Sequence, residues 1–378
     1  YIALQTNKPM RKLPILLLIL LTLSSCTVGR FIWYNFSNIT DYKIFPSNKV
    51  NKSNQPYTIP AKLTTFPITA TVNNKETSFE YFLKKSKTVG FMIIINDTIR
   101  YQHFDNGYTD TSIVTSFSVG KSVVSMLVGC AIADGYIKSI EEPITDYIPE
   151  LRSEMKAVKI KHLLQMTSGI KYSESYYSPF SDAAVQYYGT NLLKSVKKLR
   201  LKTTPGTTFE YISGNSQLLG MIVARALKTK TLSQYLDERI WQPLGMEFPA
   251  TWSTDSKKRN QEKAFCCLNA RAADFAKLGL LYLHKGNWQG KQIVPAAWVN
   301  AAEGIDTTEG GDPDYQYNWW KVGKKGAYQA NGHLGQYIYV DPINKVVIVR
   351  FGKKGAGVNW SSLFYSISHQ VALQPKKQ

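Results

Sequence analysis

The amino-acid sequence predicts a mixed α/β (α+β) fold, in which helices flank an antiparallel sheet and an all-helical lobe is inserted. A β-hairpin pattern occupies residues 90–104, and further strand patterns occupy residues 327–352. Between them, residues 161–285 have mainly helical hydrophobic periodicity. Strand patterns on both sides of a helical segment indicate that the two ends of the chain meet in one sheet.

The strands are expected at the two ends of the main domain. Residues 91–95 form a β-branched run, and Asn96-Asp97 is a turn sequence that leads into a second strand. Residues 337–340 and 346–349 repeat the pattern around a turn at residues 341–344. These segments supply the antiparallel hairpins of the predicted sheet.

Three helices stand out from the spacing of apolar residues. The first begins at Ser118 and ends near Gly135. The second covers residues 269–283, where large apolar side chains recur along one stripe, and Gly286 ends it. The last spans residues 360–373 and closes the chain.

The composition is that of a globular protein with a basic surface. The chain has 378 residues, 44% of them hydrophobic, and a net charge of +19. The basic residues are spread along the whole sequence and form no arginine-rich block. Because a nucleic-acid site would be clustered, we expect no nucleic-acid partner and interpret the charge as a bias toward anionic envelope surfaces.

The first 26 residues are interpreted as upstream residues plus a lipoprotein signal peptide. Residues 1–9 precede a plausible start at Met10 and are expected not to be translated. A basic segment, the apolar run at residues 13–23 and small residues before Cys26 are typical of a secretory signal. Lipidation at Cys26 would anchor an exported protein to a membrane of the bacterial cell envelope, and an uncleaved anchor helix is the alternative.

Residues 27–87 are expected to be an N-terminal extension, part of which packs against the main domain at residues 88–378. The extension is polar but rich in aromatic residues, unlike a flexible tether. Beyond Cys26 the cysteines are Cys130, Cys266 and Cys267, and since adjacent cysteines rarely pair, no disulfide is predicted. The five histidines have no metal-ligand spacing, so neither a metal nor a cofactor is expected.

Ser118 and Lys121 are the candidate nucleophile and base. Ser-x-x-Lys occurs four times, but only this copy lies in an apolar helix, where both side chains share a face. Burial favours the neutral form of Lys121, and a neutral amine beside a hydroxyl can activate it. One alternative is a structural lysine that extends to solvent. A phosphate-binding loop is the other, and it lacks its first glycine because Thr115 stands there.

Two more segments complete the candidate site. Tyr211 follows a Pro-Gly turn and precedes a helix, where a phenol can project into a cleft, although it could equally be a packing residue. The backbone amides of Ser118 and Gln336 are the predicted oxyanion hole. His333 and Gly335 precede Gln336 at a strand edge that substrate could approach, although His333 could also be a surface loop residue.

Taken in order, these motifs resemble the serine β-lactamase and penicillin-binding-protein superfamily, in its class C-related branch. The resemblance covers about residues 88–370 and includes the Leu-Leu-x-x-Thr-Ser-Gly-like segment at 163–169. The Phe-x-Tyr-x-Ser form at 209–213 and the loop at 172–177 are similar to 6-aminohexanoate-dimer hydrolase-like members. The resemblance implies a β-lactamase-like fold and substrate contacts from Tyr176 and Ser213, besides His333 and Gly335.

Two departures from the class C pattern bear on function. Ser213 stands where class C β-lactamases have asparagine, and His333 stands where they have the lysine that holds the β-lactam carboxylate. The resemblance therefore implies an ester or amide hydrolase that forms an acyl-enzyme on Ser118 and acts on a small or peptide-like substrate. Alternatives are a β-lactamase, a D-alanyl-D-alanine carboxypeptidase or a non-catalytic penicillin-binding sensor lipoprotein. The sequence does not specify the oligomeric state.

Overall fold

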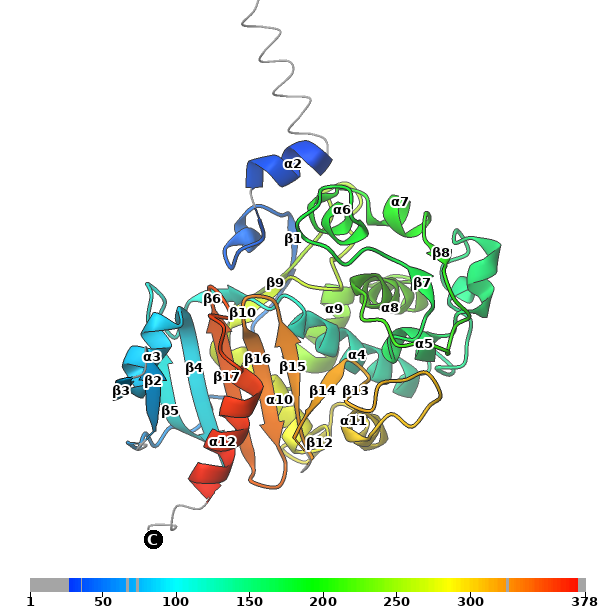
Figure 1. The fold of residues 1–378 in the computed structure, drawn as a ribbon. Helices are drawn as coiled ribbons and strands as arrows, with labels where there is room; N and C mark the ends of the chain where they lie inside the picture. The colour runs from blue at the N-terminus through cyan, green and yellow to red at the C-terminus, as the bar shows by residue number, and fades with distance from the viewer. Residues whose placement is uncertain (1–26, 35, 66–67, 73–74, 324–325, 373–378) are drawn as a thin grey trace, which may run out of the picture.

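A seven-stranded antiparallel sheet forms the centre of the molecule in the computed structural model, which describes residues 27–34, 36–65, 68–72, 75–323 and 326–372 (Figure 1). The N-terminal hairpin β4–β5 joins the C-terminal strands through β17, so both ends of the chain meet in one sheet as predicted. The strand order is β13 (Tyr315–Gln316), β14 (Trp319–Val322), β15 (Ala327–Gly332), β16 (Gln336–Asp341), β17 (Val346–Gly352), β4 (Thr88–Ile95), β5 (Thr98–Phe104).

Helices cover both faces of this sheet (Figure 1). Along β4, Phe91 and Ile93 belong to the cluster that packs on α3 (Phe79–Lys85) and α12 (Trp360–Ala372). Met92 and Ile94 point the other way, into the main core with α10 (Ala272–Leu283). Because alternate side chains of the strand are buried on opposite faces, β4 is continuously hydrophobic rather than alternating.

The helix expected at residues 269–283 begins three residues later, at Ala272. Residues 269–271 instead belong to strand β10 (Leu268–Arg271), which pairs with β6 (Ile113–Thr115). Pairing with a partner strand overrides the helical periodicity here. The chain reverses at the other end through Lys285 and Gly286, both with positive φ, so the predicted stop at Gly286 is confirmed.

The inserted lobe is mainly helical but not all-helical. Residues 170–171 and 200–201 form the short ladder β7–β8, because the chain beside it is held by two bonds to the Gly169 carbonyl. The other helices of the lobe surround the buried α4 (Val119–Ala133), and they are α5 (Ile160–Leu164), α6 (Asp182–Tyr188), α7 (Leu192–Val196), α8 (Ser213–Ala226), α9 (Leu232–Leu236), with η2 (Ile144–Asp146), η3 (Ser153–Ala157) and η4 (Asp237–Trp241).

A second sheet ties the N-terminal extension to the body of the protein. Strand β1 (Ser47–Val50) pairs with β9 (Ala250–Ser253), and the sheet continues through β10 to β6. The prediction that part of the extension packs on the main domain is therefore confirmed. The remaining elements lie at the periphery and are α2 (Thr27–Tyr34), η1 (Asp41–Lys43), β2 (Thr69–Val72), β3 (Lys75–Ser78), β11 (Asn287–Trp288), β12 (Lys291–Gln292), α11 (Ala296–Glu303).

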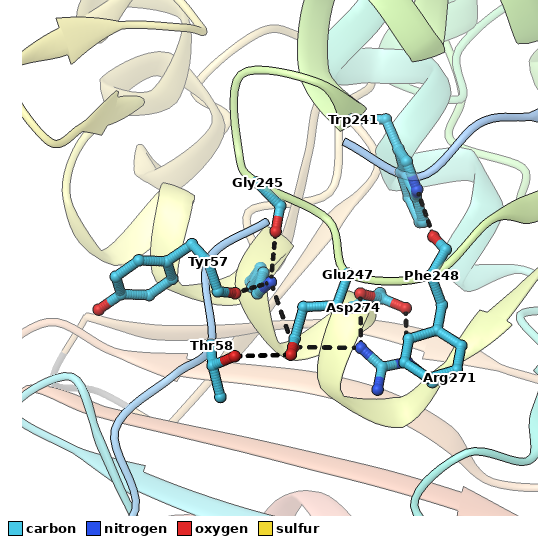
Figure 2. A network of polar contacts seen from close by, with 9 residues as sticks. Tyr57, Thr58, Trp241, Gly245, Glu247, Phe248, Arg271 and Asp274 are labelled. Atoms are coloured by element: carbon cyan, nitrogen blue, oxygen red, sulfur yellow. Dashed lines mark hydrogen bonds and ion pairs between the residues drawn. The ribbon is translucent and has the colours of Figure 1, made fainter. Parts of the chain in front are cut away.

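Figure 2 shows how polar contacts fasten the extension beyond β1. Glu247 accepts a hydrogen bond from the Thr58 hydroxyl at 2.7 Å and forms an ion pair with Arg271 at 3.2 Å. Lys277, which has no exposed side-chain surface, donates to the carbonyls of Tyr57 and Gly245. Buried ionic groups need such partners, since leaving one unpaired would cost several kcal/mol.

The two adjacent cysteines are joined, so the prediction that they do not pair is wrong. Cys266 and Cys267 form a disulfide in the turn between β9 and β10, where Cys267 has a φ of 72°. This left-handed conformation brings two successive side chains to the same side of the chain, which an extended strand cannot do. Cys130 is a free, buried thiol in α4, as expected for a small core residue.

Two observations concern metal binding and membrane-spanning helices. Within the described ranges, no cluster of three His, Cys, Asp or Glu side chains could hold a metal ion. No helix of the same ranges has both the length and the apolarity needed to cross a bilayer. The predicted signal peptide and Cys26 lie outside the described residues.

Candidate active site

Ser118 is half-buried and lies at the N-terminal end of α4, a helix that is buried from Val119 to Ala131. Its side chain makes no capping bond to the helix, so its hydroxyl is available for other contacts. The preceding residue, Phe117, has a φ of 43°, which is unfavourable for a residue with a bulky side chain. The surrounding packing holds this strained turn and fixes the direction of the serine side chain.

Lys121 reaches back from the first turn of α4 to the serine. Only 1% of the residue is exposed. Its side-chain nitrogen lies 3.1 Å from Ser118 Oγ, 2.9 Å from Ser213 Oγ and 3.0 Å from the Phe265 carbonyl oxygen. Burial lowers the pKa of Lys121 to about 8, against the opposing effect of the Glu174 charge. A substantial fraction of the side chain is therefore neutral near physiological pH and able to accept a proton.

Glu174 is a member of this network whose role the sequence did not indicate. Its carboxylate accepts bonds from the Ser213 backbone nitrogen at 2.7 Å and from the Ser213 hydroxyl at 2.5 Å. Ser213 opens α8, so the carboxylate also meets the positive end of that helix dipole. In the sequence, the loop at 172–177 stands out only by its family resemblance, which does not predict a contact between Glu174 and Ser213.

These contacts fix the direction in which hydrogen atoms point. The Ser213 hydroxyl donates to Glu174, so toward Lys121 it can only accept, and the Phe265 carbonyl can only accept as well. A neutral Lys121 has two hydrogens, which these two acceptors take. Its lone pair is then directed at the Ser118 hydroxyl, which is the geometry of a base beside a nucleophile.

Tyr211 lies on the other side of the lysine. Its ring centroid is 5.3 Å from the Lys121 nitrogen, and it packs against Tyr315 and Trp320 from the edge of the large sheet. Burial raises the pKa of the Tyr211 phenol, while a hydrogen bond with Ser118 acts in the opposite direction. The phenol keeps its proton at neutral pH, so it is suited to donate a proton rather than to remove one.

The β15–β16 hairpin packs against the start of α4. A side-chain carbon placed on Gly332 would lie 3.3 Å from the Ser118 nitrogen, so the hairpin backbone passes directly beside that amide. Gln336 pairs with Gly332 across the hairpin and uses its side-chain amide for the carbonyls of His333 and Gly352. The two backbone amides predicted as the oxyanion hole thus belong to adjoining segments.

Gly335 lies on the side of the hairpin away from the serine, where it faces a buried arginine. Its φ is 81°, and a Cβ there would lie 2.1 Å from a terminal nitrogen of Arg350. Arg350 donates to the Gly335 carbonyl at 2.5 Å and stacks on Trp360. Gly335 therefore has a structural reason to be glycine, and its contact with substrate stays a prediction.

A small hollow of about 30 Å³ opens beside the serine, enough for about one water molecule. His333 lies at its rim, where its ring meets Phe117 edge-on and stacks with Tyr176 at a centroid distance of 6.3 Å. Burial against these rings lowers the pKa of His333, so the imidazole is neutral near pH 7. The residues that line the hollow are Ser37, Phe117, Ser118, Tyr176, Tyr187, Cys266 and His333.

The segment behind the lysine is held by a second buried lysine that the sequence reasoning missed. Lys263 donates to the carbonyls of Gln186 and Tyr187 at 3.0 and 2.8 Å. Burial lowers the pKa of Lys263 to about 7. Its hydrogen bonds all go to backbone carbonyls at the end of α6, and it lies 4.8 Å from the Phe45 ring centroid, so it positions residues 263–267, and with them the Phe265 carbonyl, rather than reaching the hollow.

Comparisons with known proteins match most of the chain. A family model described as beta-lactamase matches residues 71–362. The 6-aminohexanoate-dimer hydrolase of Paenarthrobacter ureafaciens is 25% identical over 296 residues, which are 72% of this chain and 74% of that protein.

Solved structures have the same architecture. A Bacillus anthracis protein assigned as a candidate 6-aminohexanoate-dimer hydrolase superposes with a TM-score of 0.80 at 24% identity, over 89% of this chain and 94% of that one. A candidate beta-lactamase from Bacteroides dorei has a TM-score of 0.63 at 18% identity, over 76% and 95% of the two chains. At these identities the structures support the fold alone, and they confirm the predicted fold class.

Proposed function

The chain belongs to the beta-lactamase family of serine hydrolases, and we propose that it cleaves an ester or amide bond through an acyl-enzyme on Ser118. The observation that carries this proposal is the buried Lys121 nitrogen 3.1 Å from the Ser118 hydroxyl, with the Ser213 hydroxyl and the Phe265 carbonyl placed to accept both hydrogens of the neutral amine. A lysine that merely extended to solvent would be exposed and would not share all its hydrogens with buried acceptors.

In the first step, neutral Lys121 takes the proton of Ser118 while the serine oxygen forms a bond to the substrate carbonyl carbon. The carbonyl oxygen becomes an oxyanion, which the backbone amides of Ser118 and Gln336 would stabilise as hydrogen-bond donors. The carbon–leaving-group bond then breaks, and the leaving alcohol or amine takes a proton.

Tyr211 is the proposed donor of that proton, because its phenol is protonated at neutral pH and lies beside both Ser118 and Lys121. The proton on Lys121 can then return to the phenolate, which restores the tyrosine. Water then attacks the acyl carbon as Lys121 removes its proton, and the bond to Ser118 breaks as the serine oxygen takes a proton from Tyr211, which Lys121 then reprotonates. Such acid–base assistance is worth about 10²–10⁴-fold in rate.

The substrate is proposed to be a short ester or amide without a carboxylate that must be clamped. A neutral His333 stands at the position where the family resemblance places a cation, and no lysine or arginine is among the residues that line the described hollow. Because this arrangement lacks a fixed positive charge, it favours neutral substrates over β-lactams. A β-lactamase or D-alanyl-D-alanine carboxypeptidase is the second candidate, because the chain belongs to the beta-lactamase family.

A screen of purified protein tests the proposal. We expect hydrolysis of short p-nitrophenyl esters or amide oligomers, weak or no turnover of nitrocefin, and covalent labelling of Ser118 by a fluorescent phosphonate. Ser118→Ala should abolish both turnover and labelling while the folded state survives. Stable acylation by penicillin without turnover would instead identify a sensor, and normal turnover by Ser118→Ala would refute the nucleophile.

For the location of the protein we propose export and lipidation at Cys26, supported by the order of basic, apolar and small residues before it. The wild-type chain should partition with bacterial membranes, and Cys26→Ser should release it. Recovery of wild-type protein in the soluble fraction with its N-terminus intact would contradict a lipid anchor.

A further inference from the structure

An exposed apolar patch lies at the end of the molecule where the described chain begins. Large hydrophobic side chains there are 51–81% exposed, although such residues are normally scattered singly over a surface. Half of the strongly exposed large hydrophobics of the described chain gather in this patch, which consists of Ile32, Trp33, Phe36, Tyr177 and Phe180.

Two segments that are distant in the sequence form this patch. Phe36 and Tyr177 are in ring contact at 6.0 Å, and Phe180 and Thr27 line the same hollow. Helix α2 is seated firmly on α6, since Arg30 donates to the Tyr188 carbonyl at 2.9 Å and Phe31 packs edge-on against the Tyr188 ring. The side chains of Ile32 and Trp33 therefore remain exposed on a helix whose other face is already occupied.

Cations flank the patch. Lys194, Lys198 and Arg259 outnumber the one carboxylate, Asp182, in the hollow that Thr27 and Phe180 border, which has a volume of about 660 Å³. Among the residues that the structure describes, none of these three has a carboxylate within ion-pair distance. Unpaired cations beside exposed Trp, Tyr and Phe match the chemistry of an anionic bilayer interface, where aromatic rings insert and basic side chains meet headgroups.

We propose that this patch docks on an anionic lipid surface. The chain itself points to this occupant, because α2 begins at Thr27, directly after Cys26, the residue proposed above to carry the lipid. The net charge of +19 favours the same partner over a neutral one. A second copy of this basic chain would instead have to bring like charges together.

Docking would also orient the hydrolase site. Ser37 and Tyr176 line the hollow beside Ser118, and each is the chain neighbour of a patch residue, Phe36 or Tyr177. The opening beside the nucleophile thus borders the surface that meets lipid. Substrates that partition into the interface would reach Ser118 from the bilayer side, a consequence that goes beyond the reaction proposed above.

Fluorescence quenching in vesicles tests the docking. The full chain carries a fluorophore at Trp33→Cys, or in a second variant at Tyr177→Cys, and is bound to vesicles of equal parts phosphatidylglycerol and phosphatidylcholine containing a headgroup nitroxide lipid. The matched control is Ile305→Cys, which is 67% exposed and follows α11 by two residues, and Figure 1 shows α11 far from α2. The circular dichroism spectrum and the melting temperature verify that each variant is folded.

We expect strong quenching at position 33 and 177 and little at 305, because only the patch meets lipid. Charge reversal of Lys194, Lys198 and Arg259 should weaken binding to the vesicles. The vesicle concentration required for half-maximal quenching at position 33 should rise by at least tenfold. The same reversal at the exposed Lys62, Lys291 and Lys345 changes net charge equally and should have a much smaller effect.

Equal quenching at positions 33 and 305, or none at 33 and 177, would overturn the proposal. Vesicle-independent changes that grow with protein concentration would assign the patch to a second copy and would also overturn it. Docking and hydrolysis fail separately: quenching with an unreactive Ser118 would refute only the proposed function, and normal ester turnover without quenching would refute only the docking.

Discussion

Replacing Glu174 with glutamine removes one charge from the active-site network while keeping the shape of the side chain. In the structure a single hydroxyl, that of Ser213, bridges the Glu174 carboxylate and the Lys121 nitrogen through bonds of 2.5 and 2.9 Å. The charge of Glu174 raises the pKa of Lys121 against the larger effect of burial. Its removal must therefore lower that pKa further.

The size of the change follows from the separation of the charges. Two unit charges about 5 Å apart interact by about 3 kcal/mol at an effective dielectric constant of about 20. One pH unit corresponds to about 1.4 kcal/mol, so this interaction sets an upper limit of about two pH units. We expect the pKa of Lys121 in Glu174→Gln to fall by about one to two pH units.

The assay is the rate of phosphonate labelling of Ser118 as a function of pH, which does not depend on knowing the substrate. In the wild type the rate should rise as pH passes about 8, because Lys121 acts as a base only after losing its proton. In Glu174→Gln the same rise should occur at lower pH. The plateau rate should also fall by about tenfold, since the amide oxygen cannot accept both Ser213 bonds.

Glu210→Gln is the matched control. Glu210 precedes Tyr211 in the chain, but its carboxylate points outward to Lys202 at 3.1 Å and its side chain is 43% exposed. Loss of this charge should leave the pH at which the rate rises unchanged. If the labelling rate of Glu174→Gln rises at an unchanged or higher pH while the control is unchanged, the assigned coupling between Glu174 and Lys121 is refuted.

Three further predictions follow from the same geometry. Lys121→Arg keeps the charge but cannot lose its proton, so turnover of a p-nitrophenyl ester should fall at least about 10²-fold; a mild loss would move the base role to Tyr211 or His333. His333→Lys should raise nitrocefin hydrolysis more than hydrolysis of a neutral ester, and faster nitrocefin turnover by the wild type would contradict this. Gly335→Ala should lower the free energy of unfolding in urea by about 2–4 kcal/mol through its positive φ and its clash with Arg350, whereas Gly107→Ala, also at positive φ but in open space, should lose about 1 kcal/mol. Equal losses in the two glycine variants would show that the arginine contact is unimportant.

Local sequence determined the elements on which the site is built. The β-branched run of β4, the Asn96-Asp97 turn and the apolar helix after Ser118 are each specified by neighbouring residues, and the structure has all three. The Ser118–Lys121 contact is also local, because positions three apart on a helix share a face. For this reason the nucleophile and its lysine could be predicted together.

Tertiary structure decided what no spacing reveals. Residues 269–271 have helical periodicity but form a strand, since β6 offers them a partner. Cys266 and Cys267 pair because the turn between β9 and β10 holds Cys267 in a left-handed conformation. Whether a short segment becomes helix or strand, and which way its side chains face, depends here on partners distant in the chain.

The charged network of the active site is the clearest example of a feature that tertiary structure decided. Glu174 and Ser213 are 39 residues apart, and Lys121 is 92 residues from Ser213, yet two hydrogen bonds join the three side chains. The sequence by itself determined which residue types could act as nucleophile, base and proton donor. Only the folded chain decided how buried Lys121 is and which acceptors take its hydrogens, because burial and hydrogen-bond direction are properties of the packed neighbours rather than of the residue.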